Sequence, residues 1–140
     1  MSLLNSATYW LVTVITVSPF SNGGKNIENG ELYITATTSA MIIAAICQGK
    51  IEALKGAFAD KLHQPYRADL IPGMYDVFAA ANSKGALGTT ISGAGPTLIA
   101  YTIENGEEIG KAMVEAFAKH NISSKYLVLD IDNKGAMVIE

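Results

Sequence analysis

A glycine-rich segment between two apolar, β-branched runs constrains the fold of this chain most. Residues 85–97 read Gly-Ala-Leu-Gly-Thr-Thr-Ile-Ser-Gly-Ala-Gly-Pro-Thr, and the runs Ala86–Ile91 and Thr97–Ile103 have the composition of strands. Glycine lets a backbone turn tightly and bring its N–H groups close to an anion. The pattern therefore predicts two paired strands joined by a tight glycine loop.

The only arginine of the chain lies about twenty residues before that loop. Residues 63–73 read His-Gln-Pro-Tyr-Arg-Ala-Asp-Leu-Ile-Pro-Gly, and the nine other basic residues of the chain are lysines. The planar guanidinium of Arg67 suits both oxygens of a carboxylate. A lone arginine near a loop that favours anions indicates a small acidic ligand.

Length and charge limit the class of protein. The 140 residues, 49% of them hydrophobic, can bury one core but are too few for two full domains. A net charge of −3 with unclustered basic residues argues against a nucleic-acid partner. Cys47 is the single cysteine and lies in the apolar run 40–47. This position predicts a buried thiol and a reducing, cytoplasmic setting.

Residues 1–34 are expected to form an N-terminal strand and a loop rich in glycine and asparagine, either within the same unit or as a remnant of a preceding domain. The run Leu3–Val17 is too short and too rich in threonine and asparagine for a membrane span, and it lacks the positive flank of a signal peptide. Trp10–Val17 instead predicts a strand in the middle of a covered sheet. Ser18–Gly30 predicts a loop. We therefore expect no membrane partner.

Four helices are expected after that loop, over residues 35 or 37 to 48, 51–62, 74 to about 82, and 105–119. The first carries eight consecutive apolar residues, which is typical of a core helix. The second is expected to end where Pro65 forbids continuation, so that residues 63–67 lie at a helix end. The fourth has Asn105 as its expected cap and Glu108 three residues later.

Two further strands are expected at 126–131 and 136–139, joined by a turn over 132–135. With the earlier elements, this order predicts an α+β fold. Its form is a ferredoxin-like two-layer sandwich with a mostly antiparallel sheet and helices on one face. Asp130 and Asp132 lack further ligands nearby, so no metal site is expected.

The two motifs together resemble a known family. Residues 62–73 and 85–97 resemble the C-terminal domain of bacterial homoserine kinase, in the superfamily of galactokinase, homoserine kinase, mevalonate kinase and phosphomevalonate kinase. Residues 35–140 are accordingly identified as a kinase C-terminal domain of this type. The resemblance implies transfer of the ATP γ-phosphate to the hydroxyl of L-homoserine, in threonine biosynthesis, at a site between two domains.

The resemblance also implies roles for particular residues. Arg67 matches an arginine that clamps the homoserine carboxylate, and the alternative interpretation is a surface or interdomain salt bridge, which contributes little on its own. His63 either lines the amino-acid pocket or interacts as a C-cap with the last helix carbonyls. The family loop beside the substrate and the phosphates matches Ser92, Gly93, Ala94 and Gly95. A plain hairpin turn is the alternative interpretation of these residues, and it is compatible with the functional one.

Two features of that family are missing from the 140 residues. No segment of the Pro-x-x-x-Gly-Leu-Gly-Ser-Ser-Ala type, which holds the ATP phosphates, is present. The loop 18–27 also has no second arginine for the carboxylate. Lys25 cannot supply the paired N–H donors of a planar guanidinium. ATP and Mg²⁺ are therefore expected only in the intact family enzyme, with no cofactor and no catalytic residue in this chain. Alone, the chain is expected to be inactive.

An alternative hypothesis is a non-catalytic α+β module that acts through self-association or amino-acid binding. Apolar surface that a second domain would cover tends to be buried by oligomerisation. A homodimer is therefore expected.

Overall fold

A four-stranded sheet forms the centre of the molecule. The structure is a computed structural model that describes residues 10–16, 40–58, 60–130 and 137–138. The strands are β1 (Trp10–Thr16), β2 (Gly88–Ile91), β3 (Leu98–Thr102) and β4 (Ser124–Asp130). Their order is β2-β3-β1-β4, and every neighbouring pair is antiparallel. The predicted α+β fold with an antiparallel sheet is confirmed.

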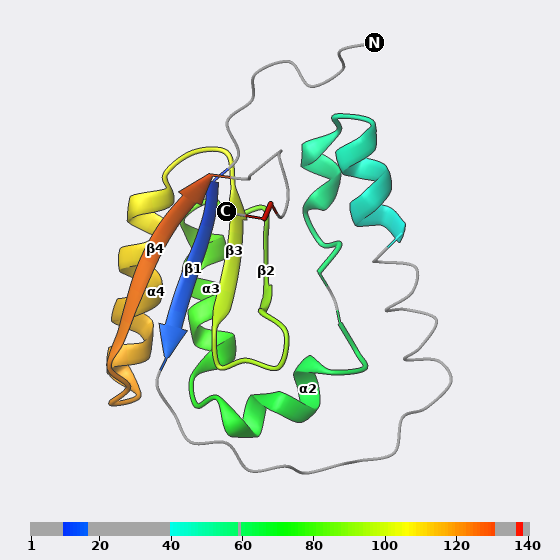
Figure 1. Cartoon of the computed structure of the whole chain (residues 1–140). Coiled ribbons are helices and arrows are strands. Elements are labelled where there is room, and N and C mark those ends of the chain that lie inside the picture. The colour runs from blue at the N-terminus through cyan, green and yellow to red at the C-terminus, as the bar shows by residue number, and fades with distance from the viewer. Residues whose placement is uncertain (1–9, 17–39, 59, 131–136, 139–140) are drawn as a thin grey trace.

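Two helices pack on one face of this sheet (Figure 1). Helix α3 (Met74–Ser83) contacts β2 and β3, while α4 (Gly106–Lys119) contacts β1 and β4, and the two helices pack on each other. Both helices were predicted, as was the hairpin of β2 and β3. From β1 onward, these six elements follow one another as β-α-β-β-α-β.

The main core lies between the sheet and the two helices. Leu98 and Ala100 on β3 are fully buried. The predicted face of α4 is also fully buried, because Ile109, Met113 and Phe117 follow one another at intervals of four residues on one stripe. Burying a side chain of this size stabilises a fold by about 1.5–3 kcal/mol. The amphipathic pattern of α4 therefore predicts correctly which face of the helix packs into the core.

Asn105 occupies the predicted N-cap position of α4 but does not cap it. Its φ of 61° is left-handed, and its side chain makes no capping hydrogen bond. Side-chain caps need an extended backbone at that position, which explains why the predicted capping box is absent. Instead, the Thr102 hydroxyl donates to the carbonyl of Glu104 and accepts from its N–H.

The region before α3 differs most from the prediction. Residues 40–47 are helical, but only Ala45 of this run is buried, and Cys47 is exposed. The helix expected over 51–62 is a single 3₁₀ turn, η1 (Ile51–Leu54), followed by further turns. Gly56, at φ +84°, takes the backbone out of the helical region. The predicted first helix is therefore present over residues 40–47, whereas its predicted burial in the core, the long second helix and the buried cysteine were wrong.

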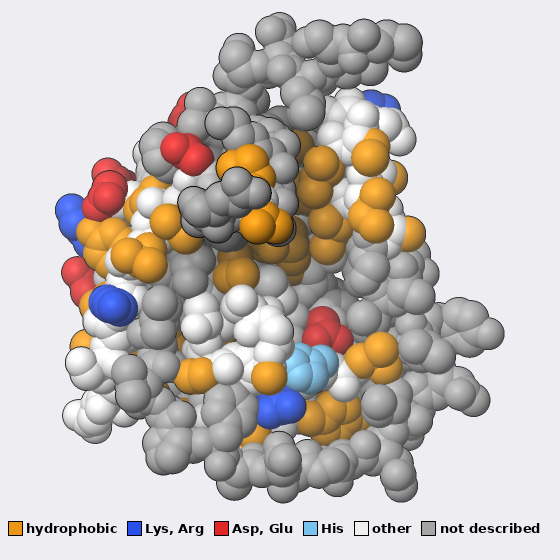
Figure 2. Space-filling model, in the orientation of Figure 1, with side chains coloured by type: hydrophobic (Ala, Val, Ile, Leu, Met, Phe, Trp, Pro, Cys, Tyr) orange, Lys and Arg blue, Asp and Glu red, His pale blue; other side chains and the backbone are white. Residues whose placement is uncertain are grey.

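The helical region 40–54 stands beside the β2 edge of the sheet (Figure 1). A small cluster of buried side chains, Ala45, Leu54 and Leu87, joins it to the rest of the molecule. Figure 2 shows apolar side chains gathered on this region at the upper right. Its burial is therefore limited to one narrow contact.

A short helix, α2 (Gln64–Arg67), and a 3₁₀ turn, η2 (Ala68–Leu70), lead into α3. Pro65 lies in the first turn of α2 rather than after a helix end. A first-turn residue needs no N–H donor, so proline fits there. His63 therefore precedes a helix at its N-cap position, and the predicted C-cap role was wrong.

Some predictions fall wholly or partly outside the described residues, namely the loop 18–30, the boundary at residue 34, the turn 132–135 and the strand 136–139. Within the described part of the chain, no helix is both long and apolar enough to span a membrane.

Tyr126 links β4 to α4 and gives the fold a dependence on alkaline pH. Its hydroxyl donates to a carboxylate oxygen of Glu107 at 2.6 Å. This hydrogen bond, with smaller contributions from burial and the Glu107 charge, raises the pKa of Tyr126 above its ordinary value of 10.0. The folded state therefore holds the phenol proton more tightly than the unfolded state does. The resulting stability is complete below the unfolded pKa and is lost as pH rises toward the folded pKa.

We expect the free energy of unfolding to fall between about pH 9 and about pH 11, and to fall less in Tyr126→Phe. Urea denaturation at the two pH values measures this. The pKa of Tyr101 is also raised, by burial, but its effect is the same in both proteins and cancels from the comparison. An identical alkaline loss in Tyr126→Phe would contradict the expectation.

Candidate functional site

Asp60 fixes where α2 begins. One carboxylate oxygen, Oδ1, accepts the N–H groups of Leu62 at 2.7 Å and His63 at 3.0 Å. The other, Oδ2, accepts the N–H of Gln64 at 3.0 Å. Amide groups at the start of a helix have no partner within the helix. The Asp60 side chain supplies these partners.

Gln64 ties the start of α2 to β2. Its side chain is buried, and Nε2 donates to Thr90 Oγ1 at 3.3 Å and to the carbonyl of Phe58 at 3.5 Å. The ring of Phe58 in turn stacks on Tyr101 of β3, with centroids 4.9 Å apart. Because Thr90 lies two residues before Ser92, this contact places α2 beside the strand that enters the glycine loop.

The segment from α2 to η2 is anchored in the main core at its C-terminal end. Ile71, directly after η2, and Met74, at the start of α3, are almost fully buried. The backbone from α2 to η2 is thus held by Gln64 at one end and Ile71 at the other. Polar side chains between them project from a fixed support.

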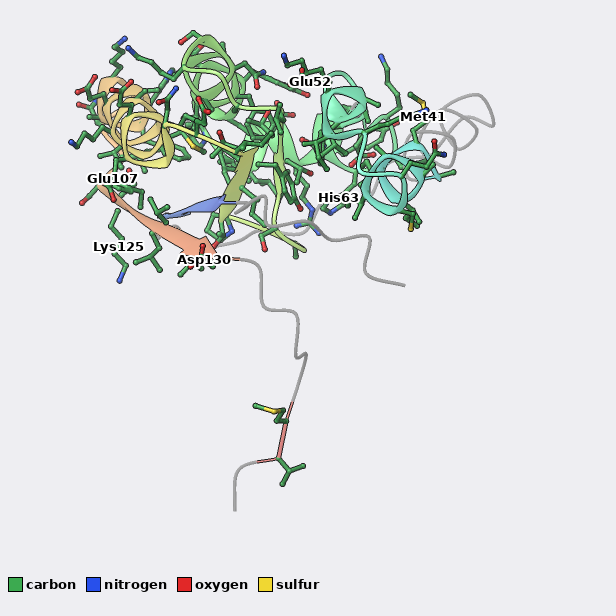
Figure 3. All side chains as sticks on the ribbon, turned by 90° about the horizontal axis from the view of Figure 1, so that it is seen from above. Met41, Glu52, His63, Glu107, Lys125 and Asp130 are labelled. Carbon is green, nitrogen blue, oxygen red and sulfur yellow. The ribbon has the colours of Figure 1, made fainter. Side chains whose placement is uncertain are left out.

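The two predicted substrate-binding residues are in contact: His63 directly precedes α2, and Arg67 is its last residue. Nε of Arg67 donates to Nε2 of His63 at 3.2 Å, and both side chains are half-buried. Their spacing of four residues is one helical turn, which brings such side chains together. Figure 3 shows His63 between the sheet and the helical region that carries Met41 and Glu52.

The hairpin between β2 and β3 carries the four predicted loop residues. The N–H of Ser92 donates to the Thr97 carbonyl at 2.8 Å, and the N–H of Gly95 donates to the Ser92 carbonyl at 3.0 Å. Gly93 and Gly95 have φ values of +56° and +78°, which favour glycine. The hairpin turns at the end of the sheet where α2 lies (Figure 1). The predicted loop is therefore a tight turn close to α2.

A groove of about 620 Å³ lies between α3, the start of β2 and residues 56–65. Aromatic rings of Phe58, Tyr75 and Phe78 line it, and α2 contributes only Gln64 and Pro65. Neither the Arg67 and His63 pair nor the hairpin residues 92–95 lie in its wall. The six predicted site residues therefore lie outside the wall of this groove.

The sequence prediction missed Asp60 and Gln64, which anchor the start of α2 next to the predicted residues. The signal was Pro65 itself, since proline is frequent in the first turn of a helix. Because Pro65 was interpreted as the end of a helix, the helix was predicted before residue 63, whereas α2 lies after it. An acidic residue just before such a turn is a common partner for its amide groups.

Known proteins similar to this chain are kinases. The family model described as GHMP kinases C terminal matches residues 42–121. A homoserine kinase of Halothermothrix orenii is 40% identical over 114 residues, which are 81% of this chain and 37% of that protein. A homoserine kinase of Moorella thermoacetica is 36% identical over 137 residues, which are 92% of this chain and 46% of that protein.

A solved structure of a homoserine kinase is also similar to this chain. The crystal structure of homoserine kinase from Cytophaga hutchinsonii matches with a TM-score of 0.80 at 26% identity, over 88% of this chain and 42% of that one. The chain therefore spans less than half the length of these relatives. With a family model that matches more than half of its residues, this chain belongs to the GHMP kinases, as a C-terminal domain.

Proposed function

We propose that this chain forms the substrate side of an ATP-dependent homoserine kinase, which transfers the γ-phosphate of ATP to the hydroxyl of L-homoserine in threonine biosynthesis. One observation carries the proposal. Arg67 ends a short helix that Gln64 joins to β2, the strand that enters the glycine hairpin, in a chain similar to homoserine kinases. The family membership supports the reaction class, and the lone guanidinium supports an acidic ligand.

Arg67 and the hairpin have separate parts in this site. The guanidinium binds the substrate carboxylate through two hydrogen bonds, and His63 lines the pocket next to it. Residues Ser92, Gly93, Ala94 and Gly95 lie beside the substrate and the phosphates. We class the domain that holds them as a ferredoxin-like sandwich, and we place the enzyme in the cytoplasm.

ATP and Mg²⁺ fit poorly on this chain. Among the described residues, no three His, Cys, Asp or Glu side chains lie together to hold a metal ion. The sequence also has no glycine-rich phosphate loop of the family type. Phosphoryl transfer depends on positioning and on neutralising phosphate charge. We therefore assign the nucleotide to the part of the relatives that this chain does not span, and we propose that the chain alone is inactive.

A second function is favoured by the exposed helical residues 40–47. Met41, Ile43 and Ile46 are 47%, 64% and 50% exposed. Exposed apolar surface of this kind commonly marks a contact with another protein. The alternative proposal is therefore a non-catalytic module that forms a homodimer or binds an amino acid.

Calorimetric titration of the chain with L-homoserine tests the first proposal. We expect saturable binding that Arg67→Ala weakens by about 10- to 100-fold, because a hydrogen bond to a charged group contributes about 1.5–3 kcal/mol. Arg67→Lys keeps the charge without the fork and is expected to restore only part of the affinity. Lys125→Ala removes a cation on β4, well away from His63 (Figure 3), and is expected to bind like the parent.

Equal binding by the parent and Arg67→Ala would contradict the role of Arg67. An absence of homoserine binding, together with a dimer in sedimentation at micromolar concentration, would favour the second function. A monomer in the same experiment would contradict the homodimer.

A further inference from the structure

Thr89 is a buried residue with unpaired polar groups, and it lines the groove between α3 and β2. The residue is only 7% exposed, and no residue that the structure describes forms a hydrogen bond with its hydroxyl. Buried polar groups without partners are costly, and they gain most from a ligand. We propose that the groove binds an extended, uncharged segment of a partner protein. This segment adds to β2 as a further antiparallel strand and carries serine or threonine opposite Thr89.

The backbone of Thr89 also points away from its neighbour in the sheet. Opposite residues of an antiparallel pair alternate between exchanging hydrogen bonds and exchanging none. In the register that pairs Thr89 with Ala100, the N–H of Ser92 donates to the carbonyl of Thr97. Counted back from Ser92, the next bonded position is Thr90, so Thr89 is not bonded to β3. Because β2 is the edge strand (Figure 1), the N–H and carbonyl of Thr89 face the open edge.

One residue of an extended peptide matches these two backbone groups. Its carbonyl accepts from the N–H of Thr89, and its N–H donates to the carbonyl of Thr89, as in any hydrogen-bonded antiparallel pair. Residues that are opposite each other place their side chains on the same face of the sheet. A hydroxyl on that residue therefore meets the hydroxyl of Thr89. Serine or threonine supplies it, and cross-strand pairs of this kind are stabilising.

The residues on either side of that hydroxyl residue contact aromatic rings. Successive side chains of a strand point to opposite faces, so these neighbours lie on the face of Gly88. A Cβ atom built on Gly88 would lie 1.8 Å from the ring of Phe58, which shows that this ring covers β2 there. Phe58 lines one side of the groove, and Tyr75 and Phe78 line it from α3. The flanking residues of the segment are therefore apolar.

The charges around the groove favour an uncharged segment. Asp60 is the one acidic residue and Lys61 the one basic residue among the described residues that line it. The carboxylate of Asp60 already accepts three backbone N–H groups at the start of α2. A wall with one charge of each sign selects neither an anion nor a cation. At about 620 Å³, the groove is within the range of about 300–1,000 Å³ that is usual for ligand sites.

Nuclear magnetic resonance titration with the blocked peptide acetyl-Val-Thr-Val-amide tests the strand pairing. We expect a saturable downfield shift and slower hydrogen exchange of the Thr89 amide, because it gains an acceptor. The same peptide with an N-methyl group on its threonine cannot donate to the Thr89 carbonyl. It is expected to bind about 3- to 10-fold more weakly, the effect of one hydrogen bond. Equal affinity of the two peptides, or a Thr89 amide that does not respond, would overturn the proposal.

Two tryptophan variants test the location. Ala79 is exposed on α3 and lines the groove, so Ala79→Trp fills the groove and is expected to abolish the Thr89 shift. Ala118 is exposed on α4 and does not line the groove, so Ala118→Trp is expected to bind like the parent. Circular dichroism confirms that both variants are folded. Binding that survives Ala79→Trp would show that the peptide lies elsewhere.

Thr89→Val tests the hydroxyl pair, because it keeps the backbone groups and the shape of the side chain. We expect the parent to prefer acetyl-Val-Thr-Val-amide over acetyl-Val-Val-Val-amide by about 3- to 10-fold. Thr89→Val is expected to lose this preference. A parent that binds both peptides equally would overturn the preference for serine or threonine.

Sedimentation without peptide distinguishes a partner protein from a second copy of this chain. We expect Ala79→Trp to sediment like the parent, since the groove is reserved for a different protein. Self-association of the parent that Ala79→Trp abolishes would make a second copy the occupant and would overturn the partner protein.

Discussion

Replacing Gly73 by alanine is expected to lower the free energy of unfolding by about 2–5 kcal/mol. Gly73 precedes α3 with a φ of +78°. A residue with a Cβ atom pays about 1–2 kcal/mol in this left-handed conformation. The added Cβ would also lie 2.2 Å from a ring carbon of His120, which is bonded to Asp76 at 2.7 Å. Overpacking of this kind costs about 1–3 kcal/mol.

Gly85→Ala is the matched control for this substitution. Gly85 has a φ of +96°, but an added Cβ there would meet nothing within 4 Å. We expect it to lose only the backbone contribution, about 1–2 kcal/mol. Gly73→Ala in a His120→Ala background is expected to recover most of the cost of the clash. Urea denaturation measures the parent, both glycine variants, His120→Ala and the double variant. Equal losses for Gly73→Ala and Gly85→Ala would show that the His120 ring does not occupy that space.

The parts of the fold that could be predicted from the sequence are those with strong local patterns. The apolar stripe of α4 repeats at helical spacing through Met113, and the glycine hairpin lies between two β-branched runs. In both cases neighbouring residues contain the whole signal. Tertiary contacts then agree with the local preference, so these elements appear where they were expected.

The helical region 40–54 shows where local patterns fail. Its run of eight apolar residues is typical of a buried helix, yet Ile43 is 64% exposed and Cys47 is exposed as well. Composition shows that the apolar surface of a helix favours burial. It does not show which part of the molecule, or which other molecule, buries that surface. In this chain the buried part of the region is the small cluster that Ala45 and Leu54 form with Leu87, directly before β2.

The site was predictable only in part for a similar reason. Arg67 could be singled out because it is the only arginine and lies in a motif, and its contact with His63 follows from their spacing on α2. The bond from Gln64 to Thr90 joins residues 26 positions apart. No local pattern encodes such a contact, so the anchoring of α2 against β2 emerges only from the folded structure.

The second large effect is expected in kinase activity, when this chain is joined to the part of the relatives that it does not span. If ATP and Mg²⁺ bind to the part of the relatives that this chain does not span, the isolated 140 residues lack most of what lowers the barrier to phosphoryl transfer. Joining them to that part should restore the reaction. Halothermothrix orenii homoserine kinase offers a suitable host, since the aligned segment is 40% identical and makes up 37% of that protein.

The most direct measurement is therefore the homoserine-dependent formation of ADP by the isolated chain and by a chimera in which this chain replaces the aligned segment of that kinase. We expect no activity from the isolated chain and clear activity from the chimera. In the chimera, Arg67→Ala is expected to lower kcat/KM by about 10- to 100-fold, and Lys125→Ala is expected to leave it unchanged. Activity of the isolated chain, or a folded chimera that is inactive or indifferent to Arg67→Ala, would contradict the proposal that this chain is the substrate half of a homoserine kinase.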